Sequence, residues 1–122
     1  MTIVCVDDHS VMLRGIKQSV EQILPDACIV AFANADDALG FAKENGCDIL
    51  ISEIELRGTD GLTLAKKIKG LNPKVNIIFV TVCSENEHAK AVMRLKPSGY
   101  LTKEATNVQL LEELKNLRYP VA

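Results

Sequence analysis

The stretch DILISEIELRGTDGL, residues 48–62, decides the fold of this chain. It opens with an apolar run that stops at Ser52 and Glu53, passes through a glycine-containing loop, and ends where an amphipathic pattern begins at Gly61. A short apolar run bounded by turn residues is typical of a buried strand, and the pattern after it is typical of a helix. The stretch therefore predicts a strand, a loop and a helix, with a glutamate at the very end of the buried strand.

The same alternation continues along the whole chain. Strands are expected where apolar and β-branched residues run together, at residues 2–6, 28–32, 48–52, 76–82 and 99–102. Helices are expected after them, at residues 10–24, 34–46, 60–71, 84–96 and 106–118. The predicted N-caps are Ser10, Asn34, Asp60 and Ser84, the last in a capping box with Glu87. Five alternating pairs predict an α/β domain whose mostly parallel sheet is covered on both sides.

Composition bounds the class of protein. The chain has 122 residues, of which 48% are hydrophobic and 25% charged, and these values are ordinary for one globular domain with its own core. The formal net charge is −2, and lysine and arginine are scattered along the sequence, so no nucleic-acid binding by this domain is expected. No apolar run approaches the length of a membrane span and no signal-like segment opens the chain, so we expect a cytoplasmic location without membrane contact.

The cysteines and histidines do not form a recognisable metal motif. The four cysteines are Cys5, Cys28, Cys47 and Cys83. They are far apart in sequence, without a C-x-x-C pair or a neighbouring histidine, so a zinc site is not expected. All but Cys47 lie inside apolar runs, where a free cysteine behaves as a small core residue. His9 and His88 are isolated, and neither is assigned a catalytic role.

Polar side chains follow four of the five predicted strands at the point where each strand ends. They are Asp7 and Asp8, Glu53, Thr81 and Lys103. The carboxyl ends of parallel strands meet at one edge of the sheet, where ligands bind in such folds. Clustered carboxylates need a cation, and oxygen ligands suit Mg²⁺, whereas a lysine and a threonine suit phosphoryl oxygens. Each feature alone is more often a cap, a β-former or a solvated charge, but their coincidence at one edge predicts a magnesium and phosphoryl site.

Four segments together resemble the receiver domain of bacterial two-component response regulators. They are VCVDDHSVMLRGI (4–16), DILISEIELRGTDG (48–61), IIFVTV (77–82) and GYLTKEAT (99–106), and the similarity covers essentially the whole chain. The resemblance implies a flavodoxin-like, doubly wound five-stranded parallel sheet of order 2-1-3-4-5 with five helices. It also implies a signalling module that is not an enzyme.

The resemblance also implies roles for individual residues. Asp7, Asp8 and the backbone carbonyl of Glu55 correspond to the Mg²⁺ ligands. Thr81 corresponds to the switch hydroxyl, Lys103 to the family's invariant lysine, and Tyr100 to the aromatic residue that moves with the threonine. Val82 stands where the family usually has alanine or glycine, which predicts narrower access to the site.

Glu53 occupies the position at which the family carries its phosphoacceptor aspartate. The extra methylene moves the carboxylate outward by about 1.5 Å, one C–C bond. Phosphoryl transfer depends on exact placement of nucleophile, metal and donor, so we expect Glu53 to be a poor acceptor and Mg²⁺ binding to be weakened. The longer carboxylate instead extends toward Thr81 and Lys103, which predicts a degenerate receiver that partly imitates the phosphorylated state. A conventional switch that uses Glu53 as acceptor is the alternative.

The expected partners follow from the same resemblance. They are a histidine kinase, an attached or separate effector that could bind DNA, and a second copy of the chain. The output face is expected to comprise the helix at 84–96, the strand at 99–102 and the last helix. We expect the receiver domain to span residues 1–118 and a linker to begin at 119–122.

Two other classes of protein share this architecture. A small nucleotide- or flavin-binding domain would need a glycine-rich phosphate loop after the first strand, where the sequence is VDDHSVM (6–12). A Mg²⁺-dependent phosphohydrolase with Asp7 as nucleophile usually carries a cap domain, for which this chain has no room. Both are therefore secondary to the receiver interpretation.

Overall fold

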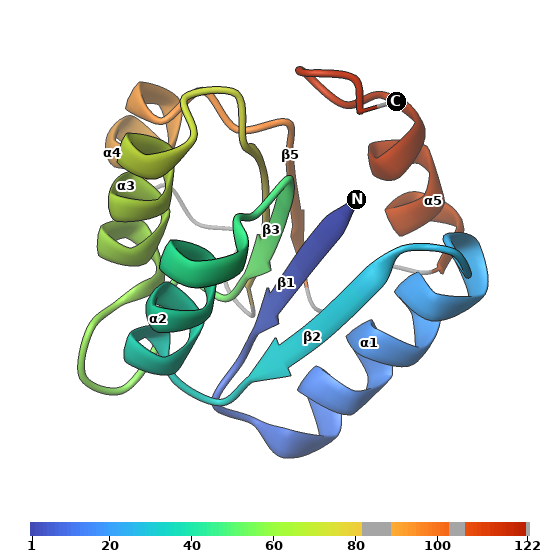
Figure 1. The fold of residues 1–122 in the computed structure, drawn as a ribbon, viewed down its shortest axis with the longest axis horizontal. Helices are drawn as coiled ribbons and strands as arrows, with labels where there is room; N and C mark the ends of the chain where they lie inside the picture. The colour runs from blue at the N-terminus through green and yellow to red at the C-terminus, as the bar shows by residue number, and fades with distance from the viewer. Residues whose placement is uncertain (82–88, 103–106, 122) are drawn as a thin grey trace.

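The computed structural model describes residues 1–81, 89–102 and 107–121. Its centre is a five-stranded sheet, drawn in Figure 1, in which every neighbouring pair of strands is parallel. The strands are β1 (Thr2–Val6), β2 (Cys28–Phe32), β3 (Ile49–Ser52), β4 (Asn76–Thr81) and β5 (Gly99–Thr102). They lie in the order β2-β1-β3-β4-β5. The predicted fold class and strand order are therefore confirmed.

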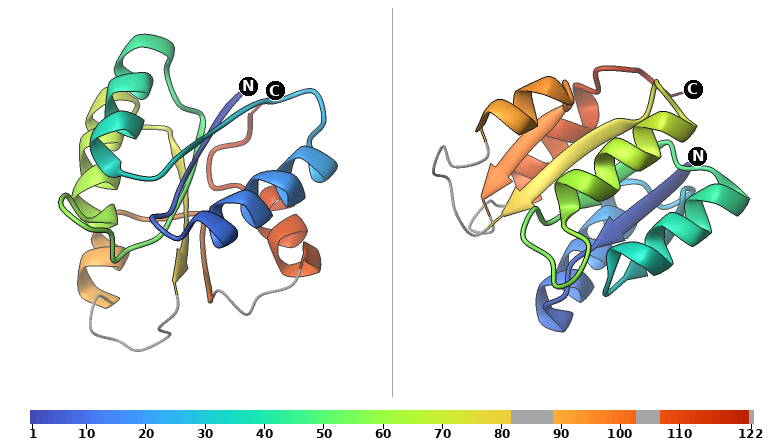
Figure 2. Two further views of the ribbon diagram at one scale, coloured as in Figure 1. Left: turned by 90° about the horizontal axis from the view of Figure 1, so that it is seen from below. Right: turned by 90° about the vertical axis from the view of Figure 1, so that its left-hand side faces the viewer.

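Helices cover both faces of this sheet. In the described parts of the chain they are α1 (Ser10–Ile23), α2 (Ala35–Asn45), α3 (Gly61–Leu71), α4 (Ala89–Arg94) and α5 (Asn107–Lys115). Two of them, α1 and α5, lie on one face, whereas α2, α3 and α4 lie on the other (Figure 1, Figure 2). None of the helices described is long and apolar enough to cross a membrane.

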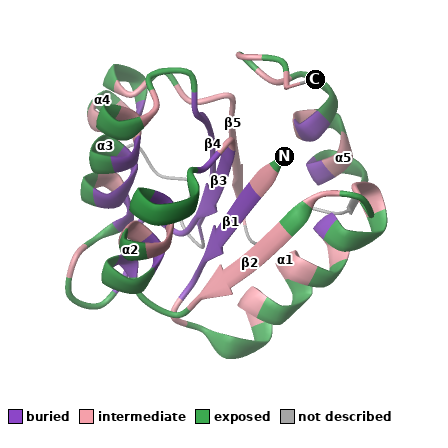
Figure 3. Ribbon diagram, viewed as in Figure 1, coloured by how far each residue is buried: buried purple, intermediate pink, exposed green. Residues whose placement is uncertain are grey.

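The core consists of two apolar layers, one on each side of the sheet. Every residue of β3 and β4 is buried, as the purple strands of Figure 3 show, which explains why these two strands are almost continuously apolar. Leu50 and Phe79 point toward α2, α3 and α4, whereas Ile51 and Val80 point toward α1 and α5. Successive side chains of a strand alternate between faces, so each strand supplies both layers.

Two of the four predicted N-caps, Asn34 and Asp60, are confirmed. Asp60 accepts a hydrogen bond from the backbone N–H of Thr63 at 2.7 Å, and Asn34 accepts one from Asp37 at 2.8 Å. The prediction of Ser10 as an N-cap is wrong, because Ser10 is the first helical residue and His9 occupies the cap position without a side-chain hydrogen bond. The side chain of His9 contacts the acidic end of β1 instead. The predicted capping box at 84–87 lies outside the described residues.

Element boundaries and one cysteine also depart from expectation. β3 begins one residue later than predicted, and α5 ends at Lys115 rather than at 118. Cys5 and Cys47 are buried, but Cys28 is exposed, so its prediction as a core residue is wrong. Cys28 is the first residue of an edge strand, which leaves its side chain open to solvent. Cys83 lies outside the described residues.

The segment after α5 returns to the amino end of β4. Asn76, which is fully buried, accepts a hydrogen bond from the Tyr119 backbone N–H at 2.7 Å and donates one to the Tyr119 carbonyl at 2.6 Å. Ser98 donates to Asn76 Oδ1 at 2.9 Å and accepts from the Arg118 backbone N–H at 3.0 Å. Residues 118 and 119 are therefore fixed to the sheet at the place where the sequence predicts the start of a linker.

Candidate functional site

Parallel pairing brings the polar strand ends together at the carboxyl edge of the sheet. Val6 and Ser52 are paired in register, and the backbone N–H of Glu53 donates to the Val6 carbonyl at 3.0 Å. Glu53 therefore lies directly beside Asp7, the residue after β1. Thr81 ends β4, two residues beyond Phe79, the partner of Ser52. The edge at the middle of the sheet is thus lined by residues from three strands.

Three of these predicted site residues are polar and yet buried. The exposed fraction is 0% for Asp7, 2% for Glu53 and 2% for Thr81. Burial of two neighbouring carboxylates is costly unless nearby cations or hydrogen-bond donors compensate. Such burial is therefore better explained by a site than by a solvated surface.

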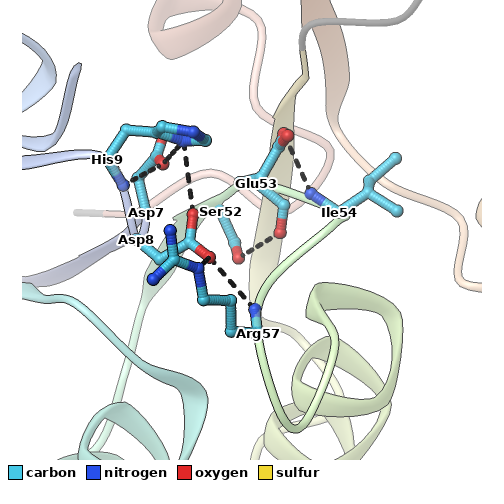
Figure 4. Close-up of polar contacts among 7 residues, drawn as sticks. All are labelled: Asp7, Asp8, His9, Ser52, Glu53, Ile54 and Arg57. Atoms are coloured by element: carbon cyan, nitrogen blue, oxygen red, sulfur yellow. Dashed lines mark hydrogen bonds and ion pairs between the residues drawn. The ribbon is translucent and has the colours of Figure 1, made fainter.

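The acidic pair after β1 forms a cluster with His9. His9 Nδ1 lies 3.1 Å from Asp7 Oδ1 and 3.2 Å from Asp8 Oδ1, and the His9 backbone N–H donates to Asp7 Oδ1 at 2.9 Å. Figure 4 shows the imidazole ring lying across both carboxylates. A protonated His9 would form ion pairs with the two acids. The sequence alone predicts no role for His9, although its position directly after the acidic pair is a signal for one.

Arg57 approaches the same pair from the loop after β3. Its backbone N–H donates to Asp8 Oδ2 at 3.1 Å, and its Nε lies 3.8 Å from that oxygen (Figure 4). The Arg57 side chain is 90% exposed, so this ion pair is weak, whereas the backbone hydrogen bond ties the loop to the end of β1. Only the folded chain brings residues 49 positions apart into this contact.

The Glu53 side chain bends toward its own backbone. Its Oε2 accepts a hydrogen bond from the Ile54 N–H at 3.1 Å, and its backbone carbonyl accepts one from Ser52 Oγ at 2.8 Å (Figure 4). The three side chains that lie within 4.8 Å of one another are Asp7, Asp8 and His9, and the Glu53 carboxylate does not join that group. Glu53 is thus buried next to the acidic cluster without being a member of it.

The structure gives less information about the other four predicted site residues, Tyr100, Glu55, Lys103 and Val82. Tyr100, in β5, is half-buried and packs against the apolar layer that faces α2, α3 and α4. Glu55 is exposed in the loop after β3, and the role assigned to its carbonyl remains a prediction. Lys103 and Val82 lie outside the described residues, although Lys103 directly follows Thr102, the last residue of β5.

The acidic pair fits a hard divalent cation. Asp8 Oδ1 is buried, with His9 Nδ1 at 3.2 Å as its contact among the described residues, and Asp7 offers a second buried carboxylate within the same cluster. Carboxylate oxygens are the ligands that Mg²⁺ prefers in proteins. Asp7 and Asp8 would hold the ion, which would supply positive charge toward phosphoryl oxygens.

A doubly wound parallel sheet with an acidic cluster at the carboxyl edge, next to the strand ends of β3 and β4, defines a flavodoxin-like α/β domain with its candidate ligand site at that edge. The comparison with protein families identifies the member of that class. Residues 3–115 match the model of the response regulator receiver domain. The chain belongs to this family, whose members are signalling domains that generally bind Mg²⁺ at an acidic pocket.

Curated relatives agree with this assignment. The chain is 26% identical to the response regulator UvrY of Escherichia coli over 117 residues, covering 96% of this chain and 54% of that protein. It is 24% identical to the response regulator GacA of Pseudomonas aeruginosa, covering 94% of this chain and 54% of that protein. The chain therefore spans about half the length of these relatives.

Solved structures show the same fold. RcsB of Salmonella enterica, solved on the promoter rprA with the phosphomimetic BeF₃⁻, superposes with a TM-score of 0.81 at 28% identity, covering 97% of this chain and 68% of that chain. A receiver domain protein from Clostridium thermocellum superposes with a TM-score of 0.83 at 23% identity, covering 94% of this chain and 91% of that chain.

Proposed function

We propose that this chain is a receiver domain in which Glu53 replaces the phosphoacceptor and partly imitates the phosphorylated state. The observation that carries the proposal is the placement of Glu53. It is 2% exposed, it follows β3 directly, and its N–H donates to the end of β1, next to Asp7. An ionised carboxylate at this point would bring negative charge to the site, but with fewer acceptor oxygens than a phosphoryl group. The domain is then biased toward its active form without being fixed in it.

The hydrogen bond from the Ile54 N–H to Glu53 Oε2 supports the expectation that Glu53 is a poor phosphoryl acceptor. A nucleophile must lie in line with the phosphoryl donor, and an oxygen that is engaged by its own backbone is poorly placed for attack. Mg²⁺ would be held by Asp7, Asp8 and the Glu55 carbonyl, and His9 and Arg57 already contact that acidic pair. Cation binding is therefore expected to be weaker than in a receiver without these contacts.

The rest of the proposed function concerns partners. We place the output face on α4, β5 and α5, with Tyr100 and Thr81 as the switch residues and Lys103 as the phosphoryl contact. The partners are an effector domain, attached beyond residue 119 or separate, and a histidine kinase where phosphorylation occurs. The promoter-bound RcsB relative makes a DNA-binding effector the favoured kind. Dimerisation through the output face belongs to the same proposal.

The test of acceptor chemistry is intact mass after incubation with Mg²⁺ and acetyl phosphate, run beside the Glu53→Asp variant. We expect the variant alone to gain a phosphoryl group, because the shorter side chain restores the acceptor position. If both proteins gain it, Glu53 is a conventional acceptor and the proposal is wrong. If neither protein gains it, restoring the aspartate is not sufficient, and other residues of the site also prevent phosphorylation.

The imitation of the active state needs a separate readout. The chain has two tyrosines, so the ring signals of Tyr100 can be followed by NMR without a phosphodonor. We expect Glu53→Gln and Glu53→Asp to shift these signals in the same direction, away from those of the native chain. Identical Tyr100 signals in all three proteins would contradict a Glu53-dependent switch state.

A further inference from the structure

A groove runs between α3 and α4 on the side of the sheet away from α1 and α5. Its volume is about 410 Å³, within the range that holds a small ligand or one or two large side chains. Its lining residues come from both helices and are Leu62, Thr63, Lys66, Ala91, Arg94 and Leu95. The two helices stand next to one another in Figure 1, and the groove lies at the border of the proposed output face, to which α4 belongs and α3 does not.

The groove is joined at one end by a polar contact. Lys69 Nζ donates a hydrogen bond to the carbonyl of Leu95, the residue after α4, at 2.8 Å. This bond ties α3 to Leu95, which lines the groove, so part of the groove wall is in place before a partner binds. A wall that is ordered before binding lowers the entropy cost of association.

Positive charge is concentrated around this groove. Six of the fourteen lysine and arginine residues of the chain lie on α3, on the described part of α4 or just after it: Lys66, Lys67, Lys69, Lys90, Arg94 and Lys96. No aspartate or glutamate occurs within Gly61–Leu71 or within the described residues 89–96. Two of these cations, Lys66 of α3 and Arg94 of α4, line the groove itself. Only the fold brings this pair together, because the two residues are far apart in the sequence.

The chemistry of the groove selects a protein segment over a nucleic acid. Leu62 and Leu95 give it apolar walls, and Lys66 and Arg94 stand beside them. None of the described residues that line it has an aromatic side chain for stacking on a base. Apolar walls flanked by cations are complementary to an apolar anchor side chain flanked by carboxylates.

We propose that the α3–α4 groove is a docking site for an acidic segment of a partner protein that inserts one or two apolar side chains between Lys66 and Arg94. The proposal does not depend on the state of Glu53 or on phosphorylation. It extends the proposed binding surface of the domain from α4 onto α3.

The test is fluorescence polarisation with a labelled twelve-residue peptide made of glutamate with one leucine and one phenylalanine. We expect saturable binding to the native chain, and a loss of at least about tenfold in affinity for the double variant Lys66→Glu, Arg94→Glu. The matched control is Lys43→Glu, Lys115→Glu, which changes the net charge equally at exposed positions on α2 and α5 and is expected to bind normally. The same peptide with serine in place of both apolar residues is expected to bind more weakly.

A second variant tests the cavity itself. Thr63→Trp fills the groove from an exposed position on α3. We expect this variant to bind the peptide that contains leucine and phenylalanine more weakly than the native chain does, and to bind the serine peptide with unchanged affinity. Thermal melting of each variant establishes that it is folded. The proposal is overturned by an absence of saturable binding, by equal loss in the matched control, or by tighter binding of a DNA duplex or an anionic vesicle. It is also overturned if the native chain self-associates and the Lys66, Arg94 double variant does not, because the occupant is then a second copy.

Discussion

At Gly61 the first turn of α3 passes against the backbone at the end of β3. A Cβ built on this residue would lie 1.9 Å from the carbonyl oxygen of Glu53 and 3.0 Å from the Cα of Ile54. The Gly61 N–H also donates to the Ile54 carbonyl at 2.8 Å, which fixes the approach. The position of Glu53 thus depends on a residue that has no side chain.

Gly61→Ala is therefore expected to destabilise the protein by roughly 2–4 kcal/mol, because backbone cannot move aside as a flexible side chain can. The measurement is the free energy of unfolding in urea. Gly70→Ala is the matched control, since it lies on the same helix with nothing within 4 Å of the added Cβ. That substitution is expected to be neutral or to stabilise by up to about 1 kcal/mol. Equal effects at the two positions would contradict the close approach.

The cysteines provide a second prediction at the scale of single residues. Burial raises the pKa of the Cys5 thiol to about 12 and that of the Cys47 thiol to about 12, whereas Cys28 is exposed. The thiolate is the reactive form, so a buried thiol with a raised pKa is protected. We expect iodoacetamide at pH 8 to modify Cys28 in the native protein well before Cys5 or Cys47, as measured by peptide mapping. Modification of all three at one rate would contradict the burial of β1.

Among the secondary-structure elements, the contact between β4 and the segment after α5 depends on one buried amide. The Asn76 side chain bonds to the backbone of Tyr119 in both directions and accepts from Ser98 before β5. Lys69 on α3 lies over the Tyr119 ring, 5.8 Å from its centroid. Four parts of the chain therefore meet at this point, so it sets where any following segment leaves the domain.

Asn76→Ala is expected to lower the free energy of unfolding by roughly 2 kcal/mol, because it leaves the polar groups of Ser98 and Tyr119 without their buried partner. Hydrogen exchange provides the specific measurement: the Tyr119 amide should lose protection while amides in the middle of β3 keep it. Asn45→Ala is a suitable control, because Asn45 is exposed and donates only to the Phe41 carbonyl within α2. Unchanged Tyr119 exchange in Asn76→Ala would show that this segment is held by other contacts.

The whole molecule should lose stability in alkali. Cys5 and Cys47 have a pKa of about 12 in the folded state against 9.0 for an ordinary thiol, so the unfolded chain releases these protons first. Stability from these groups is complete below pH 9 and falls as the pH rises from 9 toward 12. At pH 10 each thiol costs on the order of 1 kcal/mol relative to pH 8.

This dependence is measured as the difference in unfolding free energy between pH 8 and pH 10. The double variant Cys5→Ala, Cys47→Ala removes both thiols, so its stability should fall less over this interval than that of the native chain. The two proteins are compared by their slopes, because the cavities left by alanine change stability at both pH values alike. Parallel curves would mean that the folded thiols titrate normally.

The sequence by itself determined the architecture and most of the chemistry at the strand ends. Continuous apolar runs bounded by turn residues predicted the buried β3 and β4, because a parallel sheet covered on both faces needs strands without polar alternation. The acidic pair after β1 and the glutamate after β3 could be located from strand periodicity alone. Asp60 was recognisable as a cap because its role depends on residues three positions away.

Tertiary structure decided whatever depends on contacts between distant segments. Arg57 reaches Asp8 from the loop after β3, because the fold brings β1 and β3 side by side. Cys28 is exposed because its strand is at the edge, which an apolar run cannot reveal. Lys66 of α3 and Arg94 of α4 are far apart in sequence, and only helix packing brings both into one groove. The periodicity of strands and helices, and caps such as Asp60, depend on residues that are close in sequence. The neighbours of a surface charge depend instead on how the helices and strands pack together.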